Sequence, residues 1–280
     1  MKKLVSCMFA CAIASVAMAQ NSNDPKVWGW DFPMYLEINT EVGQEALTCQ
    51  MHYFELVKKG EGVVKQSMIW YDTTIAEPGK EKTKINNYGD KIEVPNTLII
   101  PLAKEAKAKK GDILLTHHKY HDMQRAIVID DSKPTEPVVC FLDESWPDKP
   151  ESTSLPEKQK GVQLKAGSFN VLKEGEFMSG AQVAYKSGSE MKFGKILQVS
   201  GDKVLVSTFA SRIDCTTKSN CKLISFKQKF KEGDKVSAIS ADCYEPGYNV
   251  VKVDKEHGHV WLQADGSKYT HCFSILDVMK

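Results

Sequence analysis

Three histidines stand close together, at His117, His118 and His121, and histidine nitrogens are common zinc ligands. On a helix, His117 and His121 would share a face and could hold one metal ion. On a strand they also share a face but lie about 13 Å apart, too far for a single ion. The preceding run, Ile113-Leu114-Leu115-Thr116, is typical of a strand, and no further ligand is identifiable. We therefore predict no metal site, and expect a solvated strand end or turn.

Other catalytic chemistry finds little support in the residues. A catalytic cysteine needs a thiolate beside a base, and none of the eight cysteines has a recognisable nucleophile context. The chain lacks a Gly-x-Ser-x-Gly elbow and a His-Glu-x-x-His helix. The acidic pairs Asp130-Asp131 and Asp143-Glu144 follow predicted strands, where we expect solvated turns. The sequence thus predicts no catalytic residues, no cofactor and no enzyme.

Four aromatic residues near the C-terminus could instead bind a ligand. Tyr244, Tyr248, Trp261 and Phe273 could meet at the mouth of a small barrel, where aromatic faces attract cations. Trp261 alternates with two residues expected in the core, so it should face outward or toward a neighbouring domain. Packing against that neighbour is the favoured alternative, and the ligand site stays open beside it.

The elements that carry these residues are short strands with period-two alternation. The clearest stretch, Lys231–Val278, contains several such runs separated by polar turns. Two earlier stretches share its layout, so that glycine openings at Gly111, Gly180 and Gly233 coincide. These openings lie roughly 50 to 70 residues apart, which indicates separate small domains and not a strict solenoid.

Alternation also predicts which side chains form the buried face of each domain. The expected pairs are Ile127 and Ile129, Leu197 and Val199, and Val251 and Val253 on the second strands, and Val138 and Cys140, Val204 and Val206, and Val260 and Leu262 on the third strands. Such a small domain buries little apolar surface alone, so we expect support from tandem packing or disulfides.

The best repeat resembles a known group of small barrels. The opening Gly-Asp-x-Val-x-Ala at 233–238 and the Val-x-x-Val-Asp strand at 250–254 are similar to those of SH3-like, Tudor-like and KOW-type domains. The likeness extends from about Lys110 to the C-terminus, apart from a linker. It implies tandem recognition or structural modules in an exported bacterial protein, although function does not follow from such a fold.

The N-terminus predicts export. Lys2 and Lys3 precede a mostly apolar run, and Ala17-Met18-Ala19 fits the small-x-small cleavage rule. The run is short for a membrane span of about 20 residues, so we predict a removable signal peptide at 1–19 and no membrane span. The formal net charge of +1 gives no basic face for nucleic acid. We expect a periplasmic or secreted protein.

The cysteines that remain after cleavage fit an oxidising compartment. They are Cys49, Cys140, Cys215, Cys221, Cys243 and Cys272. An even number in an exported chain suggests disulfides. Cys215 and Cys221 bracket a short polar loop and form the favoured pair, while Cys243 and Cys272 could tie together the ends of the last barrel. Buried free thiols are the alternative.

Together these features predict an all-β protein of tandem small SH3/Tudor-like antiparallel barrels preceded by an N-terminal β region. The expected segments are the signal peptide at 1–19, the N-terminal β region at 20–105, a first barrel at 106–147 to which strands from 88–105 can be added, a linker at 148–170, and barrels at 171–228 and 229–280. The leading hypothesis is a non-enzymatic binding or scaffold protein whose partner is an extracytoplasmic protein, peptide or glycan. The alternatives are a peptidoglycan-binding accessory protein or hydrolase, and a structural envelope protein.

Overall fold

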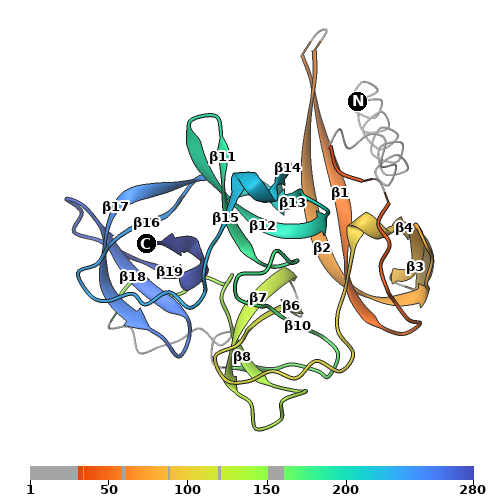
Figure 1. Cartoon of the computed structure of the whole chain (residues 1–280), viewed down its shortest axis with the longest axis horizontal. Helices are drawn as coiled ribbons and strands as arrows, with labels where there is room; N and C mark the ends of the chain where they lie inside the picture. The colour runs from red at the N-terminus through yellow and green to blue at the C-terminus, as the bar shows by residue number, and fades with distance from the viewer. Residues whose placement is uncertain (1–30, 34, 59–60, 88, 119–120, 151–160) are drawn as a thin grey trace, which may run out of the picture.

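The computed structural model describes residues 31–33, 35–58, 61–87, 89–118, 121–150 and 161–280. The predicted signal peptide lies outside these residues. The described chain consists of antiparallel strands and short 3-10 helices, which confirms the predicted all-β class (Figure 1). Within this part of the chain, no helix has the length and apolar character needed to cross a bilayer.

The strands form four five-stranded units, two of which are joined into one larger sheet by the single pair Lys192 and Cys243. We call them units I to IV, at 43–101, 111–171, 180–223 and 233–279. In every unit the last strand pairs with the first, and the remaining strands follow in sequence order. The predicted N-terminal β region therefore contains a unit of the same kind as the other three.

The bounds of the elements are as follows. Unit I contains β1 (Glu45–Lys58), β2 (Glu61–Glu77), β3 (Lys82–Asn87), β4 (Asp90–Pro95), η2 (Asn96–Leu98) and β5 (Ile99–Pro101). Unit II contains β6 (Ile113–His118), β7 (His121–Asp130), β8 (Val138–Phe141), β9 (Val162–Gln163) and β10 (Asn170–Val171). Unit III contains β11 (Gln182–Ser187), β12 (Glu190–Ser200), β13 (Lys203–Ser207), η4 (Phe209–Ser211), β14 (Ile213–Thr217), η5 (Lys218–Asn220) and β15 (Cys221–Leu223). Unit IV contains β16 (Lys235–Ser240), β17 (Cys243–Asp254), β18 (His259–Ala264), β19 (Thr270–Ser274), η6 (Ile275–Asp277) and β20 (Val278–Met279).

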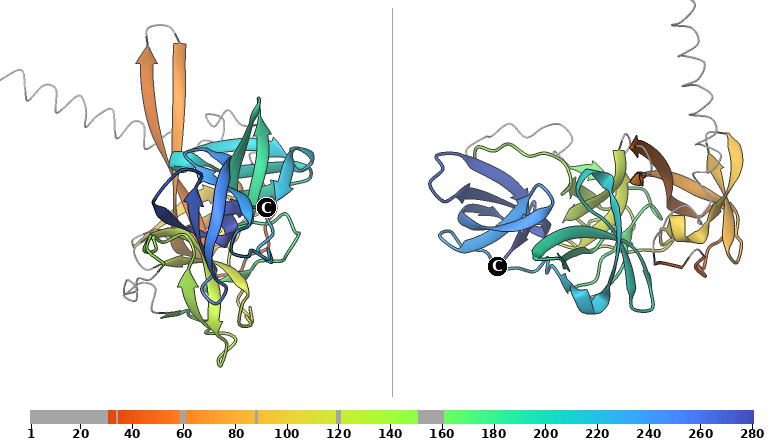
Figure 2. Two further views of the ribbon diagram at one scale, coloured as in Figure 1. Left: turned by 90° about the vertical axis from the view of Figure 1, so that its left-hand side faces the viewer. Right: turned by 90° about the horizontal axis from the view of Figure 1, so that it is seen from above.

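Two segments differ in extent from the sequence expectation. The stretch predicted as a linker, 148–170, supplies β9, which pairs with β8 of unit II. The hairpin of β1 and β2 is much longer than the other hairpins and extends away from the packed units (Figure 2). At the base of this hairpin, residues Ala46–Thr48 of β1 pair with β5.

Each unit opens on the same turn. A glycine with positive φ donates its backbone N–H to the carbonyl of a residue on the second strand. The N–H of that residue in turn donates to the carbonyl of the residue after the glycine. The glycines are Gly43, Gly111, Gly180 and Gly233, and the carbonyls belong to Ile75, Val128, Ile196 and Val250, each at 2.8 Å. Glycine adopts this backbone region without a Cβ clash. The three predicted openings therefore coincide, and Gly43 adds a fourth.

A β-bulge lies at this same place in the second strand of every unit. The register shifts directly after Ile75, Val128, Ile196 and Val250. A bulge bends its strand and increases the local twist, so each short sheet can curl over its own side chains. Among the described strands, no pairing closes a unit into a complete barrel.

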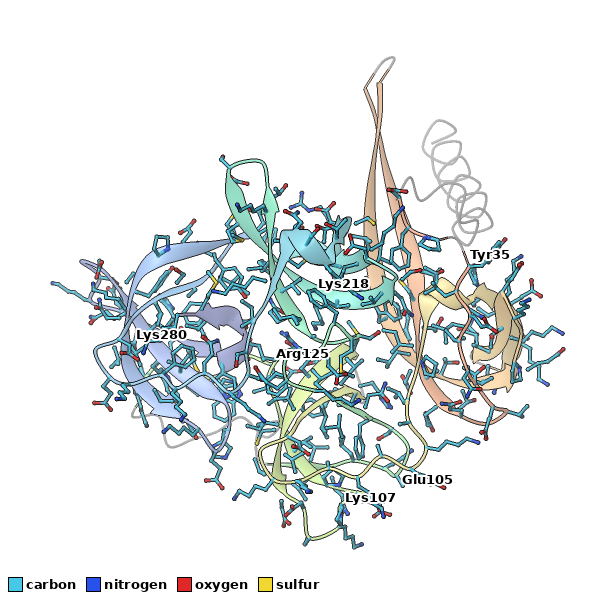
Figure 3. The ribbon with its side chains drawn as sticks, viewed as in Figure 1. Tyr35, Glu105, Lys107, Arg125, Lys218 and Lys280 are labelled. Atoms are coloured by element: carbon cyan, nitrogen blue, oxygen red, sulfur yellow. The ribbon has the colours of Figure 1, made fainter. Side chains whose placement is uncertain are left out.

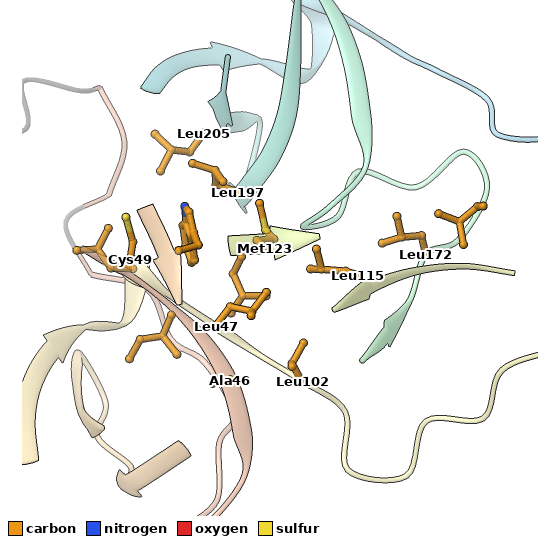
Figure 4. Packing of buried hydrophobic residues seen from close by; sticks show 14 of the residues in the cluster. Ala46, Leu47, Cys49, Leu102, Leu115, Met123, Leu172, Leu197 and Leu205 are labelled. Carbon is orange, nitrogen blue, oxygen red and sulfur yellow. The ribbon is translucent and has the colours of Figure 1, made fainter. Parts of the chain in front are cut away.

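Units II, III and IV each have a small core of their own, and a larger cluster joins the units. The small cores include Leu114, Val128 and Phe141 in unit II, Val183, Ile196 and Val206 in unit III, and Val236, Val250 and Leu262 in unit IV. The larger cluster combines the core of unit I with the outer face of unit II and with Leu197 and Leu205 (Figure 4). It also includes Leu276 of unit IV. Apolar packing thus continues across the junctions between units.

The predicted buried face is correct on some strands and wrong in unit II. Val204, Val206, Val260 and Leu262 lie in the cores of units III and IV, as alternation predicts. In unit II the core takes Ala126, Val128, Val139 and Phe141, whereas the predicted Ile127 and Cys140 belong to the cluster shared with unit I. Both faces of this sheet are covered, so both are apolar and alternation cannot select between them.

The bulges explain the remaining differences on the second strands. In unit III, Ile196 and Val199 face the core together, and the predicted Leu197 joins the shared cluster. In unit IV, Val250 takes the core position predicted for Val251. A strict period of two fails where one extra residue is inserted.

Candidate functional site

A buried ion pair lies where units II, III and IV meet. Arg125 of β7, near the centre of Figure 3, has a side chain only 3% exposed. Its Nε and Nη2 donate to Asp143 Oδ1 at 3.0 and 2.5 Å, and its backbone N–H donates to Asp143 Oδ2 at 2.8 Å. Leu142 donates its N–H to the Arg125 carbonyl, which fixes Asp143 beside the guanidinium. Burial alone would raise the pKa of Asp143, but Arg125 and Lys195 outweigh it and hold that pKa well below its usual range.

Unit III contributes two polar side chains to this pair. Gln182 on β11 and Lys195 on β12 are cross-strand partners, so their side chains share one face of the sheet. Arg125 Nη1 donates to Gln182 Oε1 at 2.7 Å, and Lys195 Nζ donates to Asp143 Oδ2 at 2.9 Å. Burial lowers the pKa of Lys195 despite the opposing effect of Asp143. Strand register thus places an amide and an ammonium against the ion pair.

Unit IV contributes a second carboxylate, Asp277 of η6. Its Oδ1 lies 3.7 Å from Arg125 Nη2, and no described residue donates a hydrogen bond to this carboxylate. Burial raises its pKa to about 6, Arg125 and Lys195 oppose the shift, and Asp143 reinforces it. Asp143 is therefore fully satisfied, whereas Asp277 remains an acceptor with a side chain that is 28% exposed.

Arg125, Asp143, Lys195 and Asp277 form what we call the charge cluster. Two hollows flank it, and both are lined by Asp143, Phe273 and Asp277. The first, the junction cavity, has a volume of about 380 Å³. Its other walls are Arg125, Gln182, Phe193, Lys195, Ser207, Thr208 and Ile239. The second, the acidic cavity, has a volume of about 390 Å³. Its other walls are Leu142, Glu144, Ser145, Trp146, Asp148, His259, Cys272 and Ser274.

The four aromatic residues predicted as a ligand site do not gather into one cage. Trp261 is buried and donates from Nε1 to the Pro147 carbonyl at 2.9 Å, so it packs against a neighbouring segment. Tyr244 is buried in a cluster with residues of unit III. Tyr248 and Phe273 form an edge-to-face pair with ring centroids 6.0 Å apart. Of the four, Phe273 is the one that lines both cavities.

No disulfide is present among the cysteines of the described residues, so neither predicted disulfide is formed. Cys215 lies on β14 and Cys221 on β15, at opposite edges of unit III. Cys272 on β19 pairs with Trp261 on β18, which pairs with Lys252 on β17. Cys243 lies at the opposite end of β17 from Lys252, so Cys243 and Cys272 are not neighbours. Burial raises the pKa of Cys140 and Cys221 to about 11, and of Cys272 to about 12. These thiols are therefore protonated at neutral pH and are weak nucleophiles.

The histidine cluster ends β6 and begins β7. His118 is buried and lies edge-on to Phe141, and His117 Nδ1 lies 4.0 Å from Asp72 Oδ2 of unit I. The expectation of a solvated strand end is therefore wrong for these two residues, because unit I packs against this corner. Among the described residues, no group of three His, Cys, Asp or Glu side chains is placed to hold a metal ion.

Sequence reasoning does not single out the residues of the charge cluster as a site. It places Asp143 in a solvated turn, yet this side chain is 13% exposed at the centre of the cluster. One signal is available: Arg125 stands within the mostly apolar run from Met123 to Ile129. An arginine inside a buried strand requires a partner, although the sequence does not say which.

Comparison with protein-family models and with curated proteins finds no match to this chain. The fold and site therefore define its class. It is an all-β chain of four like five-stranded units, three of which meet at a buried Arg125–Asp143 pair beside two cavities.

Proposed function

We propose that this chain is an exported, non-enzymatic binding protein built of tandem SH3-like units, and that it takes its ligand in the junction cavity. The observation that carries the proposal is the charge cluster, through which Arg125 and Asp143 hold Lys195 beside Asp277 at one cavity shared by three units. The signal-peptide pattern at 1–19 and the repeated strand order support export and the tandem organisation.

The energetics of the cluster favour a role in recognition. Desolvating two charges is costly, and replacing a buried ion pair with apolar side chains is often neutral or stabilising. Arg125 and Asp143 are therefore a poor choice for stability alone. They do fix the positions of Gln182 and Lys195 through directed hydrogen bonds, which is what a binding site requires of its supporting residues.

The walls of the junction cavity suit a small or extended polar ligand. Phe193, Ile239 and Phe273 supply apolar surface, and Lys195 and Asp277 supply one donor and one acceptor. This mixture of apolar wall and few polar groups is typical of ligand sites. A peptide or glycan outside the cytoplasm offers both an acceptor for Lys195 and a donor for Asp277.

The test uses the chain from residue 20 onward, with purified cell walls, soluble glycans and short peptides as probes. Binding is measured by cosedimentation and calorimetry. Phe193→Ala should weaken binding at least about tenfold by removing an apolar wall. Tyr269→Ala is the matched control, because Tyr269 is 75% exposed and lines neither cavity.

Each outcome bears on the proposal. Retention of one probe class that Phe193→Ala weakens supports the site, and retention on cell walls would make the ligand peptidoglycan. Equal binding by both variants would contradict the location. Hydrolysis of any probe would contradict the non-enzymatic role, and failure to retain any probe would favour a structural envelope protein.

A further inference from the structure

The acidic cavity has an unusual lining. It lies between the segment that follows β8 in unit II and the elements β18, β19 and η6 of unit IV. Carboxylates line it at Asp143, Glu144, Asp148 and Asp277, and none of the described lysines or arginines does so. Arg125 and Lys195 neutralise Asp143, so the negative charge of the cavity comes from the other three carboxylates. A cavity lined by charge of one sign concentrates ions of the opposite sign. This lining alone would fit any cation.

A buried histidine gives the cavity a more specific character. His259 is 1% exposed, and its ring stacks on Trp146 with centroids 3.9 Å apart. Its Nδ1 lies 2.7 Å from the His257 carbonyl and must donate to it, so Nε2 carries a lone pair. No described residue donates to Nε2. Since Nδ1 is occupied, Nε2 is the ring nitrogen left for a ligand, and burial keeps the ring neutral by lowering its pKa to about 4.

The cavity therefore has two acceptors to which no described residue donates a hydrogen bond, one buried and one partly exposed. The buried acceptor is His259 Nε2, and the partly exposed one is the carboxylate of Asp277, which is 28% exposed and whose Oδ1 lies 3.7 Å from Arg125 Nη2. A third acceptor, the carboxylate of Asp148, is 60% exposed, and its Oδ1 accepts from the Cys272 N–H at 3.2 Å. The unmade hydrogen bond at the buried His259 Nε2 costs free energy that a bound donor would recover.

The required ligand is a cation with several N–H donors. No set of three metal-ligating side chains is assembled among the described residues, which disfavours a metal ion. A primary ammonium carries three donors in a compact head and can reach acceptors spread over different walls. We propose that the acidic cavity binds the primary ammonium group of an organic ligand, with His259 Nε2 and Asp277 as its acceptors.

The proposal goes beyond the junction cavity, and its test separates the two sites. The probes are n-butylammonium chloride, n-butanol as a neutral analogue, tetramethylammonium chloride as a cation without N–H donors, and calcium chloride as a metal cation. The readout is the 15N resonance of His259 Nε2 in the chain from residue 20 onward. Saturable movement of this resonance with n-butylammonium alone is expected. An unmoved resonance, or equal movement with tetramethylammonium or calcium chloride, would overturn the proposal.

Two carboxylate variants provide a matched comparison. Asp277→Asn should weaken n-butylammonium binding at least about tenfold, because it replaces an acceptor-only carboxylate with an amide. Asp265→Asn should leave binding unchanged, since Asp265 bonds Lys235 on another part of unit IV. Phe193→Ala should also leave it unchanged, because Phe193 lines the junction cavity and is not among the described residues that line the acidic cavity. Equal binding by the wild type and Asp277→Asn would contradict the assignment, and the wild-type resonance measurement stands whether or not a variant folds.

Discussion

Arg125 and Asp143 are joined twice, through the guanidinium and through the backbone N–H of Arg125. The pair belongs to unit II, but it is enclosed by Gln182 and Lys195 of unit III and by Asp277 of unit IV. The pair therefore depends on the contacts between units, and a substitution at the pair should lower the stability of the junction between units II, III and IV.

Asp143→Asn should destabilise the chain by about 3–5 kcal/mol, because it leaves the buried charges of Arg125 and Lys195 without their carboxylate. Urea denaturation measures the loss. Asp265→Asn is the control, and it should have little effect because the Asp265–Lys235 pair is exposed. A loss for Asp143→Asn no larger than for the control would contradict the buried cluster.

The raised pKa of Asp277 predicts an unusual pH dependence. Its folded pKa of about 6 lies above the usual value near 4, so the folded chain holds a proton that the unfolded chain has lost. Between pH 4 and 6, Asp277 therefore reduces stability as the pH rises, with Arg125, Asp143 and Lys195 facing it. As the pH rises across this window, the free energy of unfolding of Asp277→Asn should increase by about 2 kcal/mol relative to that of the wild type.

Denaturation of both proteins at several pH values checks this prediction. Asp265→Asn should show the opposite sign, and only below about pH 4, because Lys235 and Asn249 lower the pKa of Asp265 and the wild type loses this stabilisation as the pH falls. Parallel stability curves for the wild type and Asp277→Asn would show that Asp277 titrates normally.

His259 predicts an effect of opposite sign to that of Asp277. Burial lowers its pKa from about 6.5 to about 4, while the His257 carbonyl and Asp254 oppose the shift. The unfolded chain takes up a proton in this window and the folded chain does not, so stability falls as the pH drops from about 6.5 to 4. As the pH falls over this range, the difference in free energy of unfolding between the wild type and His259→Asn should change by about 3 kcal/mol in favour of the variant. NMR titration showing an imidazolium at pH 6 would contradict it.

The shared opening turn allows a comparison between equivalent glycines. Gly233 has φ of +83° and open space where the Cβ of another residue would lie. Gly233→Ala should therefore lower the free energy of unfolding by about 1 kcal/mol, which is the cost of placing a residue with a Cβ in the left-handed backbone region. At Gly180 the added Cβ would also lie 3.0 Å from Leu115 Cδ1 of unit II. Gly180→Ala should therefore cost more, about 2–3 kcal/mol by urea denaturation. Equal costs would argue against close packing of units II and III.

The sequence predicts the features that depend on local pattern. The all-β class follows from alternation, and the openings at Gly111, Gly180 and Gly233 follow from the need for positive φ. The equivalent opening at Gly43 is not recognisable by the same pattern, so the sequence predicts only a β region around it. Bulges defeat the face assignment at Leu197 and Val251, because period-two counting has no place for an inserted residue.

The candidate site is out of reach of the sequence because it depends on how whole units dock. Gln182 lies 57 residues from Arg125, and their contact requires the outer face of unit II to meet strand β11 of unit III. A carboxylate after a strand, such as Asp143, has the same local pattern whether it is solvated or buried. Only the partner units decide which, and no local spacing identifies them.

The central claim is that a ligand binds where three units meet. The most direct measurement is a crystal structure of the chain with the peptide or glycan that it retains. Ligand density between Phe193 and Phe273, in contact with Lys195 and Asp277, is the predicted result. Density confined to another surface, with the junction cavity holding only solvent, would contradict the account.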